Sequence, residues 1–202
     1  MTAEQYSKGN CLFCNKSVKR AGMIRHLMSC KERAEQIEKV NKKENGEESI
    51  FHLQIQDAYS DEYWLHFEMA GAATLKKLDK YLRAIWLECC GHLSEFSYKL
   101  WSDRIPMSRK ASQIFEAGMK ISYVYDFGSS SELIIKVVEQ RSGSPLTSKP
   151  IFLMARNGSP EYVCEECSKP AFYYCIECVI EEEKDGFLCK KHSENHPHDN
   201  YG

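Results

Sequence analysis

The cysteines of this 202-residue chain gather at its two ends, and their placement constrains the fold more than any other feature. Eight of the ten lie in the first 30 or the last 40 residues, and six of these form Cys-x-x-Cys pairs. In a reducing compartment such pairs bind metal more often than they form disulfides. We therefore expect small metal-stabilised modules at both ends, with a larger hydrophobic core between them.

The N-terminal cluster follows the pattern C-x2-C-x11-H-x3-C, formed by Cys11, Cys14, His26 and Cys30. A two-residue spacer lets a tight turn present two thiolates, and a His and a Cys four positions apart share one helix face. The spacing predicts a tetrahedral zinc site, and residues 11–30 resemble the single Cys-Cys-His-Cys zinc fingers. The alternative is a helix whose thiols gather without a metal.

The C-terminal cluster contains four ligand pairs, which can hold two zinc ions. In an interleaved arrangement, pairs one and three share one ion and pairs two and four share the other. An alternative is a single zinc on four cysteines, followed by a disordered His-rich tail. The pairs are Cys164 and Cys167, Cys175 and Cys178, Cys189 and His192, and His196 and His198.

This C-terminal segment resembles the B-box zinc modules, whose family role is protein–protein contact rather than catalysis. It departs from that pattern in its ten-residue gap after Cys178 and in the close spacing of its last two histidines. Residues 172–174 and 187–188 are predicted to form a miniature core beside the metals. Sites with four protein ligands have no open position, so we expect two to three structural zinc ions in the chain.

Composition and periodicity divide the chain into three segments. Residues 1–45 hold the finger and a charged helix from Ala21 to about Val40, followed by a solvated linker at Asn41–Ser49. Residues 46–158 form a central domain, and residues 159–202 form the C-terminal zinc module.

The central segment alternates between strand-like and helix-like patterns. Apolar residues recur with period two in residues 51–55 and 63–69, which predicts strands with one buried face. Helical spacing follows from an N-cap at Thr74 to Cys89, and Gly91 ends the helix. Further predicted elements are strands at 96–100 and 151–154, a short helix at 112–117 and a hairpin of 121–127 with 132–138. The order implies an α+β domain with a mixed or antiparallel sheet, one face covered by the helix.

Several strings in this domain resemble the plasmid pRiA4b ORF-3-like family, also labelled transposon-passenger TnpR-like. They are Thr74-Leu75, Gly91–Phe96 and above all Tyr123–Gly128, and the resemblance covers about residues 50–155. It implies an α+β domain found on plasmids and mobile elements, without an assigned activity. After Gly128 the sequence departs from the family, where Ser129, Ser130 and Leu133 replace its usual acidic residue, Trp and His.

The remaining candidate residues of the central domain are interpreted structurally. Asp126 near Gly128 is typical of a turn, although a carboxylate at a strand end could be catalytic. Cys89 is assigned to core packing and Cys90 has no partner pair. The histidines are predicted to be surface or half-buried and the tryptophans to serve the core or its rim: His52, His66 and His92, and Trp64, Trp86 and Trp101.

Charge separates the two ends. Residues 1–45 carry ten Lys and Arg against five Asp and Glu, whereas residues 157–202 carry four against ten. Phosphate is attracted only to the first of these, through Lys16, Lys19, Arg20 and Arg25. We expect a zinc-binding, non-catalytic adaptor whose finger contacts nucleic acid or an acidic partner and whose C-terminal module contacts protein.

Two other functions remain open. The first is a mobile-element-associated nuclease or hydrolase with its site near Asp126, and the second is a redox sensor that uses Cys-x-x-Cys thiols. The chain has no apolar run of signal-peptide or membrane-spanning length, so we expect a cytoplasmic protein without membrane contact.

Overall fold

The computed structural model describes residues 8–44, 46–60, 63–87, 91–158 and 162–200. It divides the chain into two compact units, Met1–Gly158 and Ser159–Gly202, and each is considered by itself below. The predicted core role of Cys89 and its neighbour Cys90 lies outside the described residues.

Within the described residues, the first unit is built on a nine-stranded sheet in which every pairing is antiparallel. This confirms the α+β class, with an antiparallel sheet. The strand order is β2-β1-β9-β4-β3-β8-β7-β5-β6. The strands are β1 (Lys8–Cys11), β2 (Ser17–Lys19), β3 (Glu48–Asp57), β4 (Trp64–Ala70), β5 (Ser94–Lys99), β6 (Ser102–Ile105), β7 (Lys120–Tyr125), β8 (Ser131–Gly143) and β9 (Ile151–Asn157).

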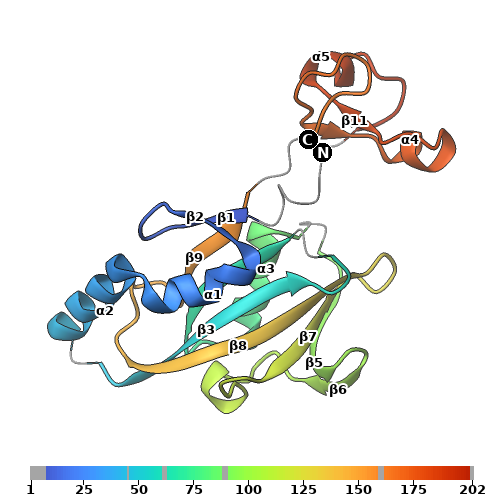
Figure 1. Cartoon of the computed structure of the whole chain (residues 1–202). Helices are drawn as coiled ribbons and strands as arrows, with labels where there is room; N and C mark the ends of the chain where they lie inside the picture. The colour runs from blue at the N-terminus through green and yellow to red at the C-terminus, as the bar shows by residue number, and fades with distance from the viewer. Residues whose placement is uncertain (1–7, 45, 61–62, 88–90, 159–161, 201–202) are drawn as a thin grey trace. The chain divides into compact units, whose positions relative to one another are not determined.

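Helices cover both faces of this sheet (Figure 1). They are α1 (Arg20–Ser29) and α2 (Lys31–Glu44) on one face, and α3 (Leu75–Ile85) on the other. Among the described residues, no helix combines the length and the apolar character needed to cross a bilayer.

The predicted covering helix is present as α3, but it is shorter than the periodicity indicates. Its buried side chains, Leu75, Leu78 and Leu82, join the main core of the sheet. The helix ends at Ile85 rather than near Gly91, because the backbone of Trp86 leaves the helical region (φ −140°). The amide groups of Trp86 and Leu87 both donate to the carbonyl of Leu82, which closes the helix.

The opposite face of β3 and β4 is also buried, so the prediction of a single buried face was wrong. Met23 and Leu27 of α1 pack with Trp64 of β4 and Met154 of β9 in a second hydrophobic core. The predicted helix of residues 21–40 is two helices, since Cys30 takes an extended conformation (φ −71°, ψ 117°) between them. The finger thus lies directly on the sheet.

The boundary predicted at residue 45 would make the N-terminal segment a separate module. The structure instead joins this segment to the central domain. Strand β1 pairs with β9, and a side chain at Gly9 would lie 2.0 Å from the carbonyl oxygen of Arg156. Helix α2 continues through the predicted linker to Glu44, and the side-chain oxygen of Asn41 accepts a hydrogen bond from the Ser144 amide (2.8 Å). Backbone pairing therefore joins the finger to the central domain.

Smaller differences concern short elements. Strands β1, β2 and β6 carry too few alternating residues to be recognised from periodicity. The helix predicted at 112–117 is a single 3₁₀ turn, η1 (Ala111–Gln113). Trp64 is buried and Trp86 is half-buried, whereas Trp101 is 49% exposed.

The second unit has little regular structure and a small core. Its elements are β10 (Tyr173–Tyr174), α4 (Ile176–Glu181), β11 (Phe187–Leu188) and α5 (Lys190–Ser193). Leu188 is buried, and Tyr173 and Phe187 pack against the cysteines, as predicted for a miniature core. The prediction fails for Phe172 and Tyr174, which are 73% and 37% exposed.

Candidate metal centres

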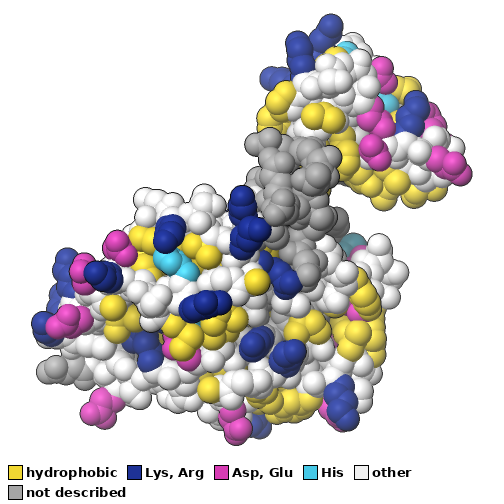
Figure 2. Space-filling view, viewed as in Figure 1, with side chains coloured by type: hydrophobic (Ala, Val, Ile, Leu, Met, Phe, Trp, Pro, Cys, Tyr) yellow, Lys and Arg dark blue, Asp and Glu magenta, His cyan; other side chains and the backbone are white. Residues whose placement is uncertain are grey.

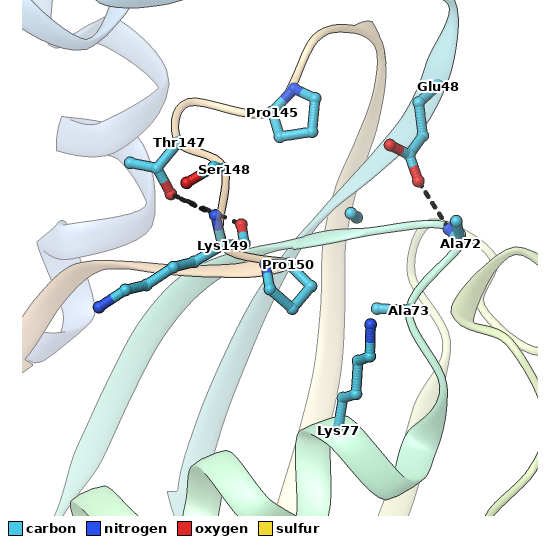
Figure 3. A pocket seen from close by; sticks show the side chains of 10 residues that line it. Glu48, Ala72, Ala73, Lys77, Pro145, Thr147, Ser148, Lys149 and Pro150 are labelled. Carbon is cyan, nitrogen blue, oxygen red and sulfur yellow. Dashed lines mark hydrogen bonds between the residues drawn. The ribbon is translucent and has the colours of Figure 1, made fainter.

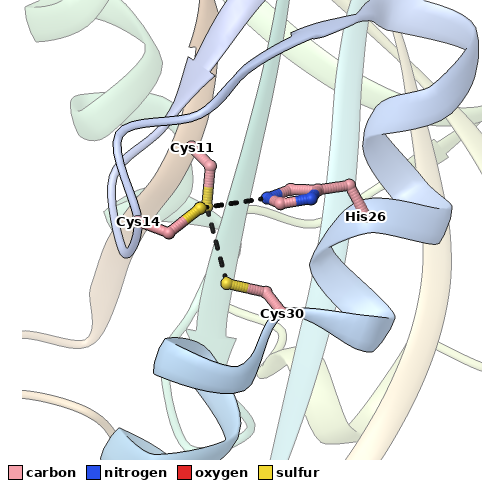
Figure 4. Close-up of side chains that lie close together, drawn as sticks. All are labelled: Cys11, Cys14, His26 and Cys30. Carbon is pink, nitrogen blue, oxygen red and sulfur yellow. Dashed lines mark hydrogen bonds between the residues drawn. The ribbon is translucent and has the colours of Figure 1, made fainter.

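The N-terminal cluster brings together the four predicted ligands from three consecutive elements. Figure 4 shows Cys11 and Cys14 on the turn after β1, facing His26 of α1 and Cys30 at the start of α2. The Sγ atoms of Cys11 and Cys30 are 3.9 Å apart, and Cys14 Sγ lies 3.4 Å from His26 Nε2. All four ligand atoms lie within 4.8 Å of one another, a geometry compatible with one metal ion.

Backbone hydrogen bonds shape the turn that carries the first two thiols. The amide of Cys11 donates to the carbonyl of Lys16 (3.0 Å), and the amide of Asn15 donates to the carbonyl of Cys11 (2.8 Å). Asn15 has a positive φ of 57°, which asparagine tolerates better than most residues. Local hydrogen bonds therefore shape the turn, and the amide of Leu12, which donates to the carbonyl of Met154 (2.8 Å), ties it to β9.

A first cluster in the second unit repeats this turn. Cys164 takes the place of Cys11, its amide donates to the carbonyl of Lys169 (2.7 Å), and Ser168 has a φ of 55°. Cys167 completes the first ligand pair, and Cys189 and His192 come from the start of α5. Cys164 Sγ lies 3.3 Å from His192 Nδ1, and the Sγ atoms of Cys167 and Cys189 are 3.8 Å apart.

A second cluster of this unit is formed by Cys175, Cys178, His196 and His198. Cys178 Sγ lies 3.1 Å from His196 Nε2 and 3.5 Å from His198 Nδ1. Cys175 caps α4, since its sulfur accepts a hydrogen bond from the Cys178 amide. The cap fixes both thiols on one helix end.

The twelve predicted ligands thus form three groups of four, each compatible with one metal ion. In the second unit, pairs one and three share a group and pairs two and four share the other, as in the interleaved arrangement. The alternative of one zinc on four cysteines with a disordered His-rich tail does not match this arrangement, because His196 and His198 lie in one group with Cys175 and Cys178. The eight described cysteines form no disulfide.

Burial favours the protonated form of two of these thiols. It raises the pKa of the Cys30 thiol to about 12 and that of Cys178 to about 11. Both thiols are therefore neutral at pH 7 without a cation beside them. A divalent ion reverses this preference because it binds the thiolate, so binding releases protons.

A buried polar network lies beneath the finger, and sequence reasoning missed it. Arg33 of α2 reaches Glu68 of β4 (3.0 Å) and Glu139 of β8 (2.7 Å), and its Nη1 donates to the carbonyl of Leu27. Arg141 forms two further hydrogen bonds with Glu68, at 2.7 and 3.1 Å. The network fastens α2 to two strands of the sheet, β4 and β8.

Two histidines extend this network. His52 and His66 are 1% and 0% exposed, so the prediction that they are surface or half-buried was wrong. His52 Nε2 and His66 Nδ1 are 2.9 Å apart, and His52 Nδ1 lies 3.6 Å from Glu139. Burial lowers the pKa of both imidazoles. The sequence did contain a hint of this network. His66 and Glu68 alternate with apolar residues along β4, and this alternation led us to assign their face to solvent.

Asp126 adopts the turn conformation that its neighbour Gly128 indicates. It has a φ of 58°, and its Oδ1 accepts a hydrogen bond from the Gly128 amide (2.9 Å). Its Oδ2 lies 3.2 Å from Nδ1 of the exposed His92. Backbone hydrogen bonds, from Gly128 first, lower the pKa of this carboxyl. Asp126 is an ionised turn residue with one histidine beside it.

A pocket of about 390 Å³ lies between the loop before β9 and the start of α3 (Figure 3). Its one acidic residue, Glu48, accepts a hydrogen bond from the Ala72 amide (2.7 Å). Thr147 Oγ1 is likewise engaged, with the Lys149 amide (3.2 Å). The groups that line the pocket offer no pair of carboxylates for acid–base chemistry.

Comparison with known proteins gives little further information. No family model and no curated protein matches the sequence. Among solved structures, the chain is similar to MM3350, a Methanosarcina mazei Go1 protein of unknown function, with 18% identity and a TM-score of 0.44. The match covers 51% of this chain and 66% of that one. The resemblance of residues 50–155 to the pRiA4b ORF-3-like family stays a prediction.

Proposed function

We propose that this chain is a zinc-binding, non-catalytic adaptor, in which the finger contacts nucleic acid and the second unit contacts protein. The observation that carries the proposal is the set of three clusters, each with four protein ligands. A metal with four protein ligands has no open position for substrate, so its contribution is structural. We further propose a cytoplasmic setting, where thiols stay reduced, and an association with mobile elements through the pRiA4b-like segment.

The ligand geometry favours zinc over other ions. Zinc bonds of about 2.3 Å to sulfur and about 2.0 Å to nitrogen give tetrahedral edges of roughly 3.5 to 3.8 Å. The shortest sulfur–sulfur and sulfur–nitrogen distances in the clusters, 3.1 to 3.9 Å, fall around these values, and all ligand atoms of a cluster lie within 4.8 Å of one another. Thiolate and imidazole ligands exclude magnesium and calcium, which take oxygen.

The finger offers a basic surface for phosphate contacts. Lys16, Lys19 and Arg25 are exposed on the turn, on β2 and on α1. Arg20 is half-buried and its Nη1 donates to the Gln56 side chain (3.3 Å). The contacts expected from such side chains are sequence-tolerant and sensitive to salt.

The second unit offers an apolar surface for a protein partner. Phe172, Tyr174 and Ile176 alternate along β10 into α4, and Ile180 lies one turn further. Ile176 and Ile180 are 48% and 71% exposed, which is unusual for side chains of this size. Glutamates surround them on α4 and after it, so we expect a partner segment with apolar and basic residues.

Two measurements test the proposal. Native mass spectrometry of the purified chain is expected to give three zinc ions per chain. An electrophoretic shift of mixed oligonucleotides is expected at low salt and is expected to disappear in the triple variant K16Q/K19Q/R25Q. The triple variant K169Q/K190Q/K191Q, with the same charge change in the second unit, serves as the control. A zinc-free, folded protein, or equal shifts in both variants, would refute the proposal.

The second candidate is a nuclease or hydrolase with its site near Asp126, and the contact between Asp126 and His92 favours it. A carboxylate that orients a histidine is one part of a general base. The variant D126N keeps a residue that tolerates the positive φ, so the turn survives while the negative charge is lost. Hydrolysis of a nuclease or esterase substrate by the wild type, lost in D126N and in H92Q, would establish this candidate. Equal behaviour of all three proteins dismisses it.

A further inference from the structure

The sheet face that carries the finger also carries basic side chains on its uncovered strands. Lys136 of β8 pairs in register with Gln54 of β3 and with Lys120 of β7, and paired residues project on the same face. Gln54 pairs in turn with His66, two residues from Trp64, which packs against the finger. Lys120 and Lys136 therefore continue the surface that starts on α1.

We call the basic face the set formed by Lys16, Lys19, Arg25, Arg104, Lys120 and Lys136. Arg104 belongs to it because it lies 3.9 Å from Glu95, which pairs with Val124 of β7. Figure 2 looks onto this side of the first unit and shows Lys and Arg side chains spread over it with apolar surface between them. An extended polyanion complements such a surface better than a compact ligand does.

The acidic groups within the face are already engaged. Glu132 is buried, and its Oε1 accepts a hydrogen bond from Trp101 Nε1 (3.0 Å). Its other oxygen, Oε2, accepts a hydrogen bond from the hydroxyl of Tyr59. Glu95 lies beside Arg104. The donors to Glu132 are neutral and Glu95 offsets Arg104, so these two carboxylates lower the positive charge of the face without reversing it, since six Lys and Arg stand against them.

Aromatic side chains stand at one end of the basic face. Trp101, in the turn between β5 and β6, is 49% exposed and contacts Phe127, which is 43% exposed, edge to face at 5.6 Å. Tyr59, 80% exposed, joins them through Glu132. Apolar rings of this size are normally buried, and their exposure beside cationic groups is typical of surfaces that stack on bases.

We infer that the basic face binds single-stranded nucleic acid, with its backbone along the lysines and arginines and an unpaired base stacked on Trp101 or Phe127. This rests on the proposed nucleic-acid contact of the finger and extends it across the sheet. A duplex hides the faces of its bases, so the aromatic end favours a single strand. No side chain here selects a sugar, and both RNA and DNA strands are expected to bind.

The test is fluorescence anisotropy with the full chain loaded with zinc. The probes are labelled fifteen-residue oligo-dT and oligo-U strands and a fifteen-base-pair duplex, each at two or more salt concentrations. Both single strands are expected to bind more tightly than the duplex. The variant W101A is expected to weaken strand binding by about five- to hundredfold, the range measured for loss of one stacking contact, and to leave the duplex unchanged. Trp101 fluorescence is expected to be quenched by oligo-dT, and the matched variant W101F isolates its signal.

A pair of double variants tests the lysines. K120Q/K136Q removes two phosphate contacts, so the slope of log affinity against log salt is expected to fall by roughly 1.4 for single strands. K76Q/K80Q removes two exposed lysines of α3, on the opposite face of the sheet, and is expected to change nothing. F127A checks the aromatic end if W101A fails to fold.

The outcomes separate this inference from the proposed function. Binding that depends on Lys16, Lys19 and Arg25 but is equal for strand and duplex, and is unaffected by W101A, F127A and K120Q/K136Q, overturns the inference alone. Absence of binding to every probe overturns both the inference and the nucleic-acid contact of the finger.

Discussion

The two ends of the chain hold the same kind of ligand cluster in different surroundings. In the first unit, the cysteines and His26 lie against Trp64, Met154 and the nine-stranded sheet. In the second unit, four of the six buried core residues are candidate metal ligands, and only Ala171 and Leu188 are not. The first cluster therefore adds to a hydrophobic core that other residues already form. The two clusters of the second unit take the place of such a core.

This difference assigns distinct tasks to the same chemistry. About 40 residues cannot bury enough apolar surface to fold without a staple, so we expect the second unit to depend on bound metal for folding. The finger has backbone pairing from β1 to β9 and the salt bridges of Arg33 in addition to its cluster. An ion bound there is expected to fix the geometry of the turn and of α1 on a sheet that folds in any case.

The largest expected effect is that of complete metal removal. With an excess of chelator, residues 162–200 are expected to lose all amide protection, because structural zinc supplies about 10 to 16 kcal/mol in modules of this size. Strands β3, β4 and β8 are expected to keep theirs. Hydrogen exchange followed by mass spectrometry measures both in one sample. If the second unit kept its protection from hydrogen exchange after chelation, the proposed difference between the two ends would be contradicted.

A matched pair of single substitutions sharpens the comparison. C175S is expected to remove one zinc ion and the exchange protection of the second unit, since few other contacts hold it. C11S is also expected to remove one ion, but to lower the melting temperature of the first unit only by about 5 to 10 °C, at about 2 to 4 °C per kcal/mol. Zinc content and thermal unfolding measure both. An equal global loss of structure in C11S would contradict the account.

Arg33 tests how firmly the finger is held. R33M leaves Glu139 without its cation and Glu68 with Arg141 alone, and the free energy of unfolding of the first unit is expected to fall by up to about 3 to 5 kcal/mol. The exposed pair of Lys42 and Glu38 (2.6 Å) gives the control, and K42M is expected to change stability by less than about 1 kcal/mol. Urea unfolding measures both, and similar values for the two variants would show that the network does not fasten the finger.

The smallest effect is that of pH on the first unit. Burial lowers the pKa of His52 and His66 below 6.5, so the unfolded chain binds protons near that pH that the folded chain does not. Stability is therefore expected to be complete above about pH 7.5 and to fall as the pH decreases through 6.5. Urea midpoints between pH 8 and pH 6 measure this, with zinc content checked at each pH. The dependence is expected to be weaker in H66Q, and an identical slope there would contradict the assignment.

The elements and ligands that could be predicted from the sequence are those that leave a local pattern in it. Alternation identified β3, β4, β5 and β7, short apolar runs identified β8 and β9, and helical spacing identified α3, because each buries a regular set of side chains. The twelve candidate ligands were recognisable because a tetrahedral site restricts both residue type and spacing. Such features need no knowledge of distant partners.

The parts that sequence reasoning missed depend on contacts between distant segments. The sequence of residues 8–11 does not indicate that β1 pairs with β9. In the structure this pairing leaves no room for a side chain at Gly9. His66 and Glu68 read as a solvent face because their cover, α1 and α2, comes from earlier in the chain. Once the finger covers that face, the same residues become a buried network.

Elemental analysis of the chain, purified without added metal, tests the central claim most directly. The account predicts three zinc ions per chain, one of which survives when residues 159–202 are removed. A metal-free chain whose residues 8–44 and 162–200 are protected from hydrogen exchange would contradict it.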